Sequence, residues 1–342
     1  MNLASLGVVF AGGAGVPRLH AALQAGVPPQ PRLLERESIP VLAVPPEALA
    51  GHPVLAPARR ADRFSKMALL AGMEAWRGCT AAPERTGLIL ATALGPHATV
   101  FRYVSEMLDF GGEKASPTLF SQSVHAAAAS MIAASAGLHG PVLTLSDLAS
   151  PFPEALALAE AWLEGGRCDT VLVAAADELS DVLAHVVRRK WRPPAAAGQA
   201  AGADAGSARR ETVPGEGAVC FRLERGDAWR VTTGAGGAAG AACRLLDTGA
   251  LGDDGSGPAD AGPPGVPAFC FTPYWGSLRI GTAFHLAAAA LMLREPRLVP
   301  GAGRPAETTP GRGAPIEIVP AGGTGRVITL QRGAQGEKHG CP

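Results

Sequence analysis

The sequence lacks a cysteine pair, a long apolar run and an excess of charge of either sign. Its six cysteines are scattered without a C-x-x-C pair, so neither a zinc ribbon nor a disulfide framework is expected. Its 30 basic side chains balance 30 acidic ones, which disfavours nucleic acid as a partner because that binding depends on excess positive charge. No two histidines have metal-ligand spacing with a third partner, so we predict no metal.

Signals for membranes and for nucleotide cofactors are also missing. The N-terminal residues 1–13 lack the basic start and long apolar run of a signal peptide. The apolar segment 283–293 is Ala-rich and too short to cross a bilayer, so we interpret it as a buried helix. No phosphate-binding glycine loop occurs in a suitable context. We therefore expect a cytoplasmic protein with no membrane span and no cofactor.

The chain does contain an alternation of apolar strands and one-sided helices. Residues 86–94 and 169–178 are continuous apolar runs of strand length, as expected for strands that are covered on both faces. Residues 61–76 place their apolar side chains on one face of a helix. These patterns predict an α/β protein.

The second part of the chain has fewer structural signals. Tracts rich in Gly, Ala and Pro, which we interpret as loops or linkers, occupy residues 193–210, 234–242, 252–267 and 300–315. Between and after them, only residues 268–296 and 316–332 have the pattern of regular structure. We predict a first domain over residues 1–230 and a shortened second part over residues 231–342.

Five segments, in order, resemble motifs of the beta-ketoacyl synthases, the condensing enzymes of fatty acid and polyketide assembly. A-D-R-F at 61–64 resembles the D-R-F motif that introduces a family helix, and 116–146 resembles the run into the nucleophile strand. P-G-E-G-A at 214–218 matches a family strand. Residues 164–178 resemble the end of the family's central helix and the strand that follows it, and residues 321–332 resemble its closing loop and strand. The resemblance implies a thiolase-like fold, layered αβαβα, with a reduced C-terminal half.

The same resemblance locates two of the family's catalytic positions in this sequence. Both are occupied by residues that are chemically inert. The family nucleophile is a cysteine at the start of the central helix, and counting from Thr144 forward or Gly166 backward places Ala149 there. A family histidine corresponds to Leu278, and the loop with the other histidine has no counterpart in the glycine-rich sequence 234–267. The resemblance therefore implies a catalytically inactive synthase homologue.

An inactive homologue that pairs with an active ketosynthase is called a chain length factor, and we predict that function here. The heterodimer would act in polyketide, aryl polyene or fatty-acid-type biosynthesis, with this subunit helping to set where the acyl tunnel ends. The bulky tunnel candidates are Phe101, Met107, Phe110 and Phe120. His125 lies in the most family-like segment, and we interpret it as an interface residue.

Acyl carrier protein is a second predicted partner. Carrier proteins are acidic, so a basic surface would attract them. The candidate docking residues are Arg59, Arg60, Arg63 and Lys66 in one cluster, and Arg188, Arg189 and Lys190 in another. Such clusters are also typical of an ordinary solvated surface.

Two alternatives from other functional classes stay open. An acyltransferase or malonyl decarboxylase with a rearranged site would need another nucleophile, such as Ser150 or Ser277. A free-standing carrier-protein binder, or a decayed homologue, would have no synthase partner. The remaining reactive residue types have plainer interpretations: Cys168 and Cys220 as small buried hydrophobes, Cys341 as an exposed tail residue and His285 as a packed histidine.

Overall fold

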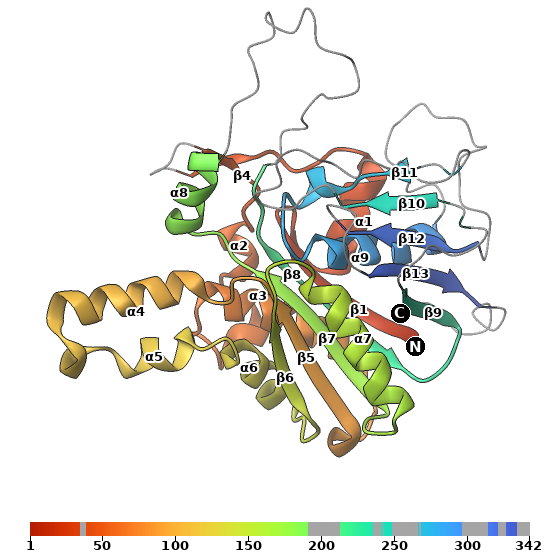
Figure 1. Cartoon of the computed structure of the whole chain (residues 1–342), viewed down its shortest axis with the longest axis horizontal. Helices are drawn as coiled ribbons and strands as arrows, with labels where there is room; N and C mark the ends of the chain where they lie inside the picture. Colours follow the sequence, from red (N-terminus) through yellow and green to blue (C-terminus); the bar gives the residue numbers. More distant parts are fainter. Residues whose placement is uncertain are drawn as a thin grey trace, which may run out of the picture.

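One mixed β-sheet runs through both halves of the chain (Figure 1). The computed structural model describes residues 1–34, 39–190, 213–234, 241, 243–247, 266, 268–295, 314–320 and 326–333. Within these residues the sheet has eleven strands, and β11 and β6 are its edges. The Gly-, Ala- and Pro-rich tracts lie largely outside the described residues, as does Cys341.

The first half of the sheet has the order β6-β5-β7-β8-β1. β8 is antiparallel to both of its neighbours, whereas β5, β6 and β7 pair in parallel. The two apolar runs predicted to be strands form β5 and β7, in which every residue is buried. The bounds are β1 Asn2–Phe10, β5 Thr86–Thr92, β6 Val142–Ser146, β7 Thr170–Asp177 and β8 Gly217–Glu224.

The second half of the sheet repeats this topology with shorter strands. If the five strands of each half-sheet are numbered by their order in the chain, both half-sheets have the spatial order third, second, fourth, fifth, first. In the second half-sheet this order is β11-β10-β12-β13-β9, and its fifth strand, β13, is antiparallel to both of its neighbours, as β8 is in the first. β9 joins β1, so the two half-sheets meet at their first strands. The bounds are β9 Trp229–Gly234, β10 Cys243–Leu246, β11 Ala268–Phe269, β12 Ile316–Val319 and β13 Val327–Arg332.

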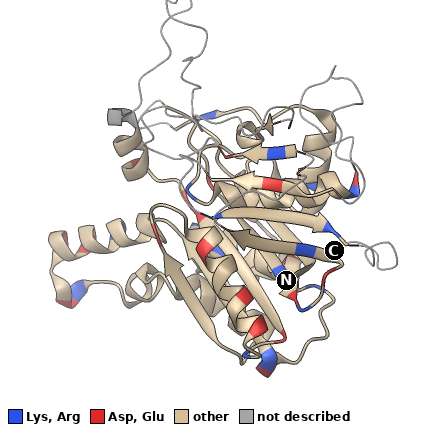
Figure 2. Cartoon of the chain, turned by 45° about the vertical axis from the view of Figure 1, so that its right-hand side comes forward, with Lys and Arg blue, Asp and Glu red and all other residues tan. Residues whose placement is uncertain are grey.

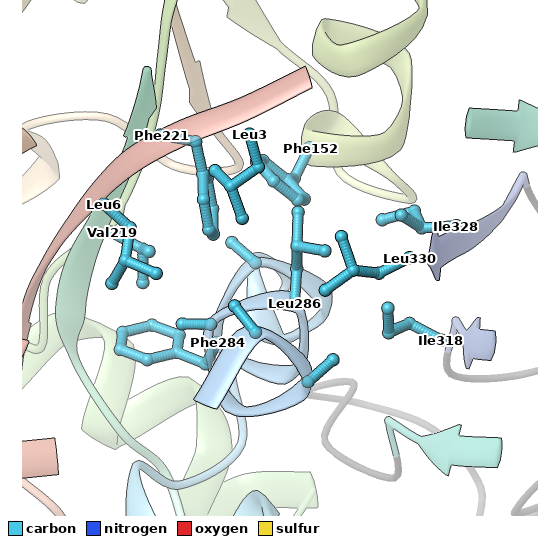
Figure 3. Close-up of a cluster of buried hydrophobic side chains, with 14 of the residues drawn as sticks. Leu3, Leu6, Phe152, Val219, Phe221, Phe284, Leu286, Ile318, Ile328 and Leu330 are labelled. Atoms are coloured by element: carbon cyan, nitrogen blue, oxygen red, sulfur yellow. The ribbon is translucent and has the colours of Figure 1, made fainter. Parts of the chain in front are cut away.

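Helices form layers on the sheets. The helices α3 (Arg63–Trp76) and α6 (Ala127–Ala136) pack on one face of the first half-sheet, where Phe64, Met67 and Leu69 of α3 are buried. The helices α7 (Pro151–Glu164) and α9 (Gly281–Arg294) share a second core with strands of both half-sheets. Figure 3 shows Leu286 of α9 between Phe221 on one side and Leu330 on the other, with Phe284 of the same helix on the side of Val219. This confirms the layered α/β prediction and the buried helix predicted at 283–293.

The remaining elements lie around these layers. The helices α4 (His97–Phe110) and α5 (Pro117–Ser123) project from the body as an arm (Figure 1). The other helices are α1 Val16–Ala25, α2 Pro46–Leu49 and α8 Asp181–Lys190, with 3₁₀ turns at Pro53–Leu55, Pro83–Arg85, Gly112–Lys114 and Thr272–Tyr274. β2 (Gly13–Ala14) pairs with β1, and β3 (Arg32–Leu34) pairs with β4 (Ile39–Val41). Among the described helices, none has the length and apolarity needed to span a membrane.

Candidate functional site

The turn between β6 and α7 is the position that the family resemblance assigns to the nucleophile. Ala149 is exposed in a bend of this turn, and Ser150 is the N-cap of α7 with φ −147° and ψ 55°. The Asp147 carboxylate holds the turn in place by accepting the Ser150 N–H at 2.7 Å. The methyl group of Ala149 can neither attack a thioester nor transfer a proton.

Ala149 and Leu278, which come from different halves of the chain, line the same small cavity. The other residues that line it are Ser150, Asp247, Arg279, Thr282 and Pro320. Its volume of about 10 Å³ is roughly the space that one water molecule needs. The cavity therefore does not hold an acyl chain.

Two charged residues of this cavity were not anticipated from the sequence. Asp247 directly follows β10, is only 3% exposed and donates its backbone N–H to the Val319 carbonyl at 3.0 Å. Arg279 is half-buried in the loop before α9. The four residues before Asp247, Cys243–Leu246, include Arg244 and are too few to give a clear strand signal in the sequence. The cavity thus contains charge, but none of its lining residues is a cysteine or a histidine.

The start of α7 is also poorly equipped to stabilise an oxyanion. A helix N-terminus binds an anion through backbone N–H groups that have no partner in the helix. Pro151 and Pro153 have no N–H to offer, and the Glu154 N–H is directed at the Ser150 carbonyl at 3.5 Å. Ser150, the alternative nucleophile, therefore has few donors around it.

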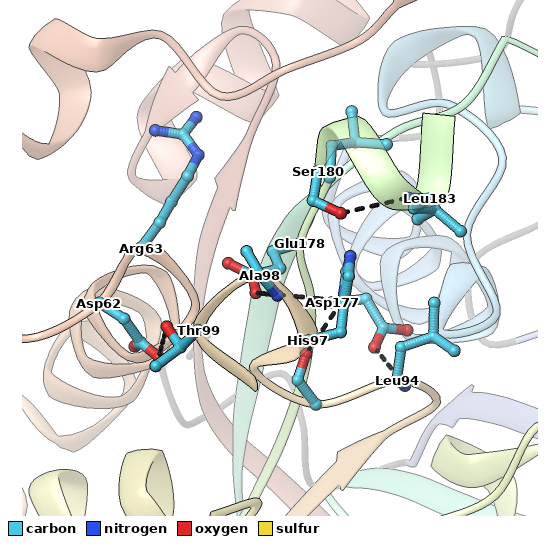
Figure 4. A network of polar contacts seen from close by, with 12 residues as sticks. Asp62, Arg63, Leu94, His97, Ala98, Thr99, Asp177, Glu178, Ser180 and Leu183 are labelled. Atoms are coloured by element: carbon cyan, nitrogen blue, oxygen red, sulfur yellow. Dashed lines mark hydrogen bonds and ion pairs between the residues drawn. The ribbon is translucent and has the colours of Figure 1, made fainter. Parts of the chain in front are cut away.

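A buried polar network joins β5 and β7 to the start of α4 (Figure 4). Asp177 accepts hydrogen bonds from the Thr92 hydroxyl at 2.7 Å and from two backbone N–H groups. Burial raises the pKa of Asp177 to about 6, although these hydrogen bonds and the charge of Arg279 lower it. Glu178 accepts the Ala98 N–H at 2.9 Å, and burial raises its pKa to about 8. These carboxyls position the start of the arm by local hydrogen bonds.

Substituting Glu178 with glutamine is expected to flatten the dependence of stability on pH. Because the folded-state pKa of about 8 lies above the ordinary value of 4.5, the folded chain binds more protons than the unfolded chain between these two values. The free energy of unfolding then falls as pH rises through that window, by at most about 1.4 kcal/mol per pH unit. Urea unfolding of both proteins at pH 5, 6, 7 and 8 measures the slope. Equal slopes for Glu178→Gln and wild type would refute this prediction.

The D-R-F and P-G-E-G-A motifs meet in a buried ion pair. The Arg63 guanidinium donates to both carboxylate oxygens of Glu216, with Nε at 3.0 and 3.1 Å, and also bonds the Val44 carbonyl. The Glu216 side chain is 1% exposed, while that of Arg63 is 33% exposed. Asp62 is the N-cap of α3, accepting the Ser65 N–H at 2.8 Å. Arg63 is therefore engaged within the chain, which differs from its predicted role in carrier docking.

The other predicted docking residues lie elsewhere. Arg59 and Arg60 are exposed just before α3, and Lys66 is half-buried in its first turn. The side chains of Arg188, Arg189 and Lys190, at the end of α8, lie outside the described residues. Figure 2 shows the basic and acidic residues dispersed over the described ribbon.

The four predicted tunnel residues all lie on the projecting arm. On α4, Phe101 is 48%, Met107 39% and Phe110 63% exposed, and on α5 Phe120 is 56% exposed. The rings of Tyr103 and Phe120 pack at 5.6 Å between centroids, which ties α5 to α4. The arm therefore presents large apolar side chains to the surface of the lone chain.

The outer edge of β6 is apolar as well. Its Val142 and Leu143 are 42% and 40% exposed, and Leu148 in the following turn is 62% exposed. His125, the predicted interface residue, is exposed, and its ring lies so close to Gly95 that a Cβ there would meet it. The backbone at position 95 also has φ +60°, so this position favours glycine both for its conformation and for the lack of space for a Cβ.

The cysteines were read correctly in two cases. Cys168 and Cys220 are fully buried, and burial raises the pKa of both thiols. None of the five described cysteines forms a disulfide. In the described part of the chain, no group of three or more His, Cys, Asp or Glu residues could hold a metal ion.

Comparison with solved structures places the fold. The structure of a beta-ketoacyl synthase from Burkholderia phymatum is similar with a TM-score of 0.71 and 17% identity, over 97% of this chain and 99% of that one. The ishigamide ketosynthase/chain length factor gives 0.69 and 18%, over 97% and 98%. A type II polyketide ketosynthase with its acyl carrier protein, AntDE:AntF, gives 0.69 and 15%, over 97% and 99%. These similarities confirm the thiolase-like ketosynthase fold.

Comparison by sequence gives the family. No curated protein matches the chain. The family model of the beta-ketoacyl synthase N-terminal domain matches residues 53–228, a range that contains both the D-R-F and the P-G-E-G-A motifs. Because this model spans more than half of the 342 residues, the chain belongs to the beta-ketoacyl synthase family.

Proposed function

We propose that this chain is a catalytically inactive ketosynthase-like subunit that pairs with an active ketosynthase and shapes its acyl tunnel. The observation that supports the proposal is the small cavity of about 10 Å³, which is lined by Ala149 and Leu278, the residues that the family resemblance assigns to the catalytic positions. Condensation needs a nucleophile and proton-transfer groups. A partner must therefore supply the chemistry, in polyketide, aryl polyene or fatty-acid-type biosynthesis.

Exposed apolar surface supports the pairing. The arm of α4 and α5 and the edge strand β6 carry most of the large apolar side chains that are exposed in the described chain. An apolar sheet edge with unpaired backbone groups is a template for another strand, and contiguous apolar patches mark interaction surfaces. A ketosynthase strand paired with β6 would continue the sheet and cover the arm.

The similarity to a ketosynthase/chain length factor structure supports a heterodimer rather than two copies of this chain. Two copies would bring together two inert cavities and could not condense acyl units. A heterodimer keeps the fold of both subunits while only one retains the catalytic residues. The partner would also stabilise this chain by mass action.

We propose that carrier protein docks to this complex partly through Arg59, Arg60 and Lys66. Arg59 and Arg60 are exposed, and the Arg60 carbonyl accepts the Gln122 side chain of α5 at 2.6 Å, so this basic turn adjoins the arm. Carrier protein bound there would lie close to the proposed subunit boundary. Such docking would weaken with added salt, as expected for steering by surface charge.

The experiment is co-expression with a candidate ketosynthase, followed by size-exclusion chromatography with light scattering and elongation assays on malonyl-loaded carrier protein. We expect a one-to-one complex that elongates only when both chains are present. Elongation or decarboxylation by this chain alone would support the alternative of a rearranged active site, with Ser150→Ala as the first variant to test. Absence of any complex would refute the pairing.

Shortening a tunnel residue is expected to lengthen the product. Phe120→Ala removes a ring that packs on Tyr103 at 5.6 Å, so it opens space on the arm where the acyl chain would end. Mass spectrometry of the products of the complex should show a shift towards longer chains. Val27→Ala is the control, because Val27 is exposed at 62% outside the arm. Unchanged product length for Phe101→Ala, Met107→Ala and Phe120→Ala would contradict this role.

A further inference from the structure

The thiol of Cys270 and the imidazole of His285 meet in the second half of the molecule, away from the turn at Ala149. Cys270 directly follows β11 and is half-buried. His285 lies in the second turn of α9 and is completely buried. The two side chains are hydrogen-bonded to each other. A thiol that is bonded to a histidine is the arrangement that activates cysteine nucleophiles.

The contacts of His285 define which ring nitrogen is the base. Its Nδ1 lies 2.9 Å from the Gly281 carbonyl oxygen, which can only accept, so Nδ1 carries the hydrogen. The Phe271 backbone N–H donates to Nε2 at 3.4 Å, so Nε2 has the lone pair. The nitrogen next to the Cys270 segment is therefore the one that can take a proton.

The surroundings of His285 change its pKa in both directions. Burial lowers the pKa of His285, but the bond to Cys270, the charges of Asp247 and Cys270 and the Gly281 carbonyl outweigh it, so the pKa is raised. The Asp247 carboxylate lies against the start of α9, where it leaves no room for a Cβ at Gly281. The Trp275 ring meets the imidazole edge-on at 5.0 Å between centroids and fixes its plane.

We propose that Cys270 is a nucleophilic thiol, with His285 as its base and the Asp247 carboxylate nearby at the start of α9, and that it accepts acyl groups from thioesters. His285 Nε2 takes the thiol proton, and the sulfur attacks the thioester carbonyl carbon. The new carbon–sulfur bond forms as the bond to the leaving sulfur breaks, and the proton passes to the leaving thiolate. One thioester and one thiol give another thioester and another thiol, so no oxidant or other reactant is needed.

The chemistry of the surroundings suits such a substrate. Phe271, Tyr274 and Trp275 form a buried aromatic cluster beside the pair, with ring centroids 5.9 to 6.4 Å apart, so the side chains next to the thiol are largely apolar. A thioester is an acyl donor whose leaving group is itself a thiol, so the exchange is nearly balanced in energy. This acyl exchange is not condensation, the activity that the inert cavity lacks, and it does not depend on the pairing proposed above.

The location of the pair allows a test on the complex. β11 and β6 are the opposite edges of the sheet, so a partner that pairs with β6 leaves the Cys270 segment outside that contact. Cys79 provides an internal control because it is also half-buried, and its sulfur accepts the Ala81 backbone N–H rather than a histidine. Both thiols can be followed in one sample by peptide mass spectrometry.

The first measurement is the rate of alkylation by iodoacetamide from pH 6 to 9. We expect Cys270 to react about tenfold faster than Cys79 at pH 6.5, with a smaller ratio at pH 9, because a paired thiolate persists below the ordinary thiol pKa. His285→Gln should abolish the ratio, and Asp247→Asn should reduce it while keeping the side-chain volume. If His285→Gln does not fold, Asp247→Asn decides. A ratio near one in wild type, or one unchanged in the folded variants, would overturn the proposal.

The second measurement is acylation by acetyl-N-acetylcysteamine. We expect an acetyl adduct on Cys270 by intact and peptide mass, which hydroxylamine removes and which Cys270→Ser lacks. Fast alkylation without any acyl adduct would overturn the thioester assignment. These measurements need no partner and no condensation. A negative result would therefore contradict the role of Cys270 but not the pairing proposal, and failure to form the complex would contradict the pairing but not the role of Cys270.

Discussion

Replacing Arg63 with alanine is expected to lower the free energy of unfolding by about 3–5 kcal/mol, the range for breaking a buried ion pair by removing one partner. Glu216, whose side chain is 1% exposed, would lose its only cationic hydrogen-bond donor among the described residues. It would still accept the Val44 N–H at 2.9 Å and the Leu179 N–H at 3.1 Å. These neutral donors do not offset the cost of a buried charge.

Chemical denaturation of the two proteins at pH 7 measures this loss. Glu216→Gln combined with Arg63→Met removes both charges and should be less destabilising than Arg63→Ala alone. Arg326→Ala is the control, because its ion pair with Glu154 is 46% and 43% exposed and such pairs contribute about 1 kcal/mol or less. A loss for Arg63→Ala as small as that of the control would show that Arg63 is a surface residue and restore it as a docking candidate.

The parts of the fold that were predictable from the sequence are those with strong local patterns. β5 and β7 are continuous apolar runs because helices cover both of their faces, and periodicity detects that directly. α9 was recognised as buried from its alanines and leucines. The turn at Ala149 was found from the family resemblance, by counting forward from Thr144 and backward from Gly166.

The repeated topology of the second half was not predictable in the same way. β10 and β11 have only four and two residues, too few to show a period of two, and they lie among Gly-rich tracts. They are specified by pairing with strands that are distant in the chain, such as Cys243 with Ile316. Short strands of this kind depend on tertiary contacts rather than local propensity.

The candidate site shows the same division. Ala149 and Leu278 could be located from motifs, but Asp247 and Arg279 reach the cavity through the chain's fold alone. Arg63 looked like one of several surface cations, because a sequence does not reveal that Glu216 lies opposite it. His285 was correctly read as packed, yet its bond to Cys270 depends on β11 ending beside α9.

Replacing Leu143 with lysine is expected to weaken association with the ketosynthase at least about 100-fold, which corresponds to about 3 kcal/mol. Leu143 is 40% exposed in the lone chain and lies on β6, whose outer edge has no strand among the described residues. In the proposed complex this side chain would be covered. A lysine there would lose its hydration without gaining a counter-charge, and lysine on an edge strand is a common device against strand pairing.

The lone chain should tolerate the same change, because the ammonium group can remain in water. Light scattering of the co-expressed chains and titration by calorimetry measure the loss of association, and urea unfolding of the lone variant checks its stability. Val27→Lys is the matched control, since Val27 is exposed at 62% just after α1, which packs against β1, β2 and α9, and should leave the affinity within about twofold. If Leu143→Lys binds as tightly as Val27→Lys, the partner does not pair with β6. The apolar arm of α4 and α5 would then have to carry the interface by itself.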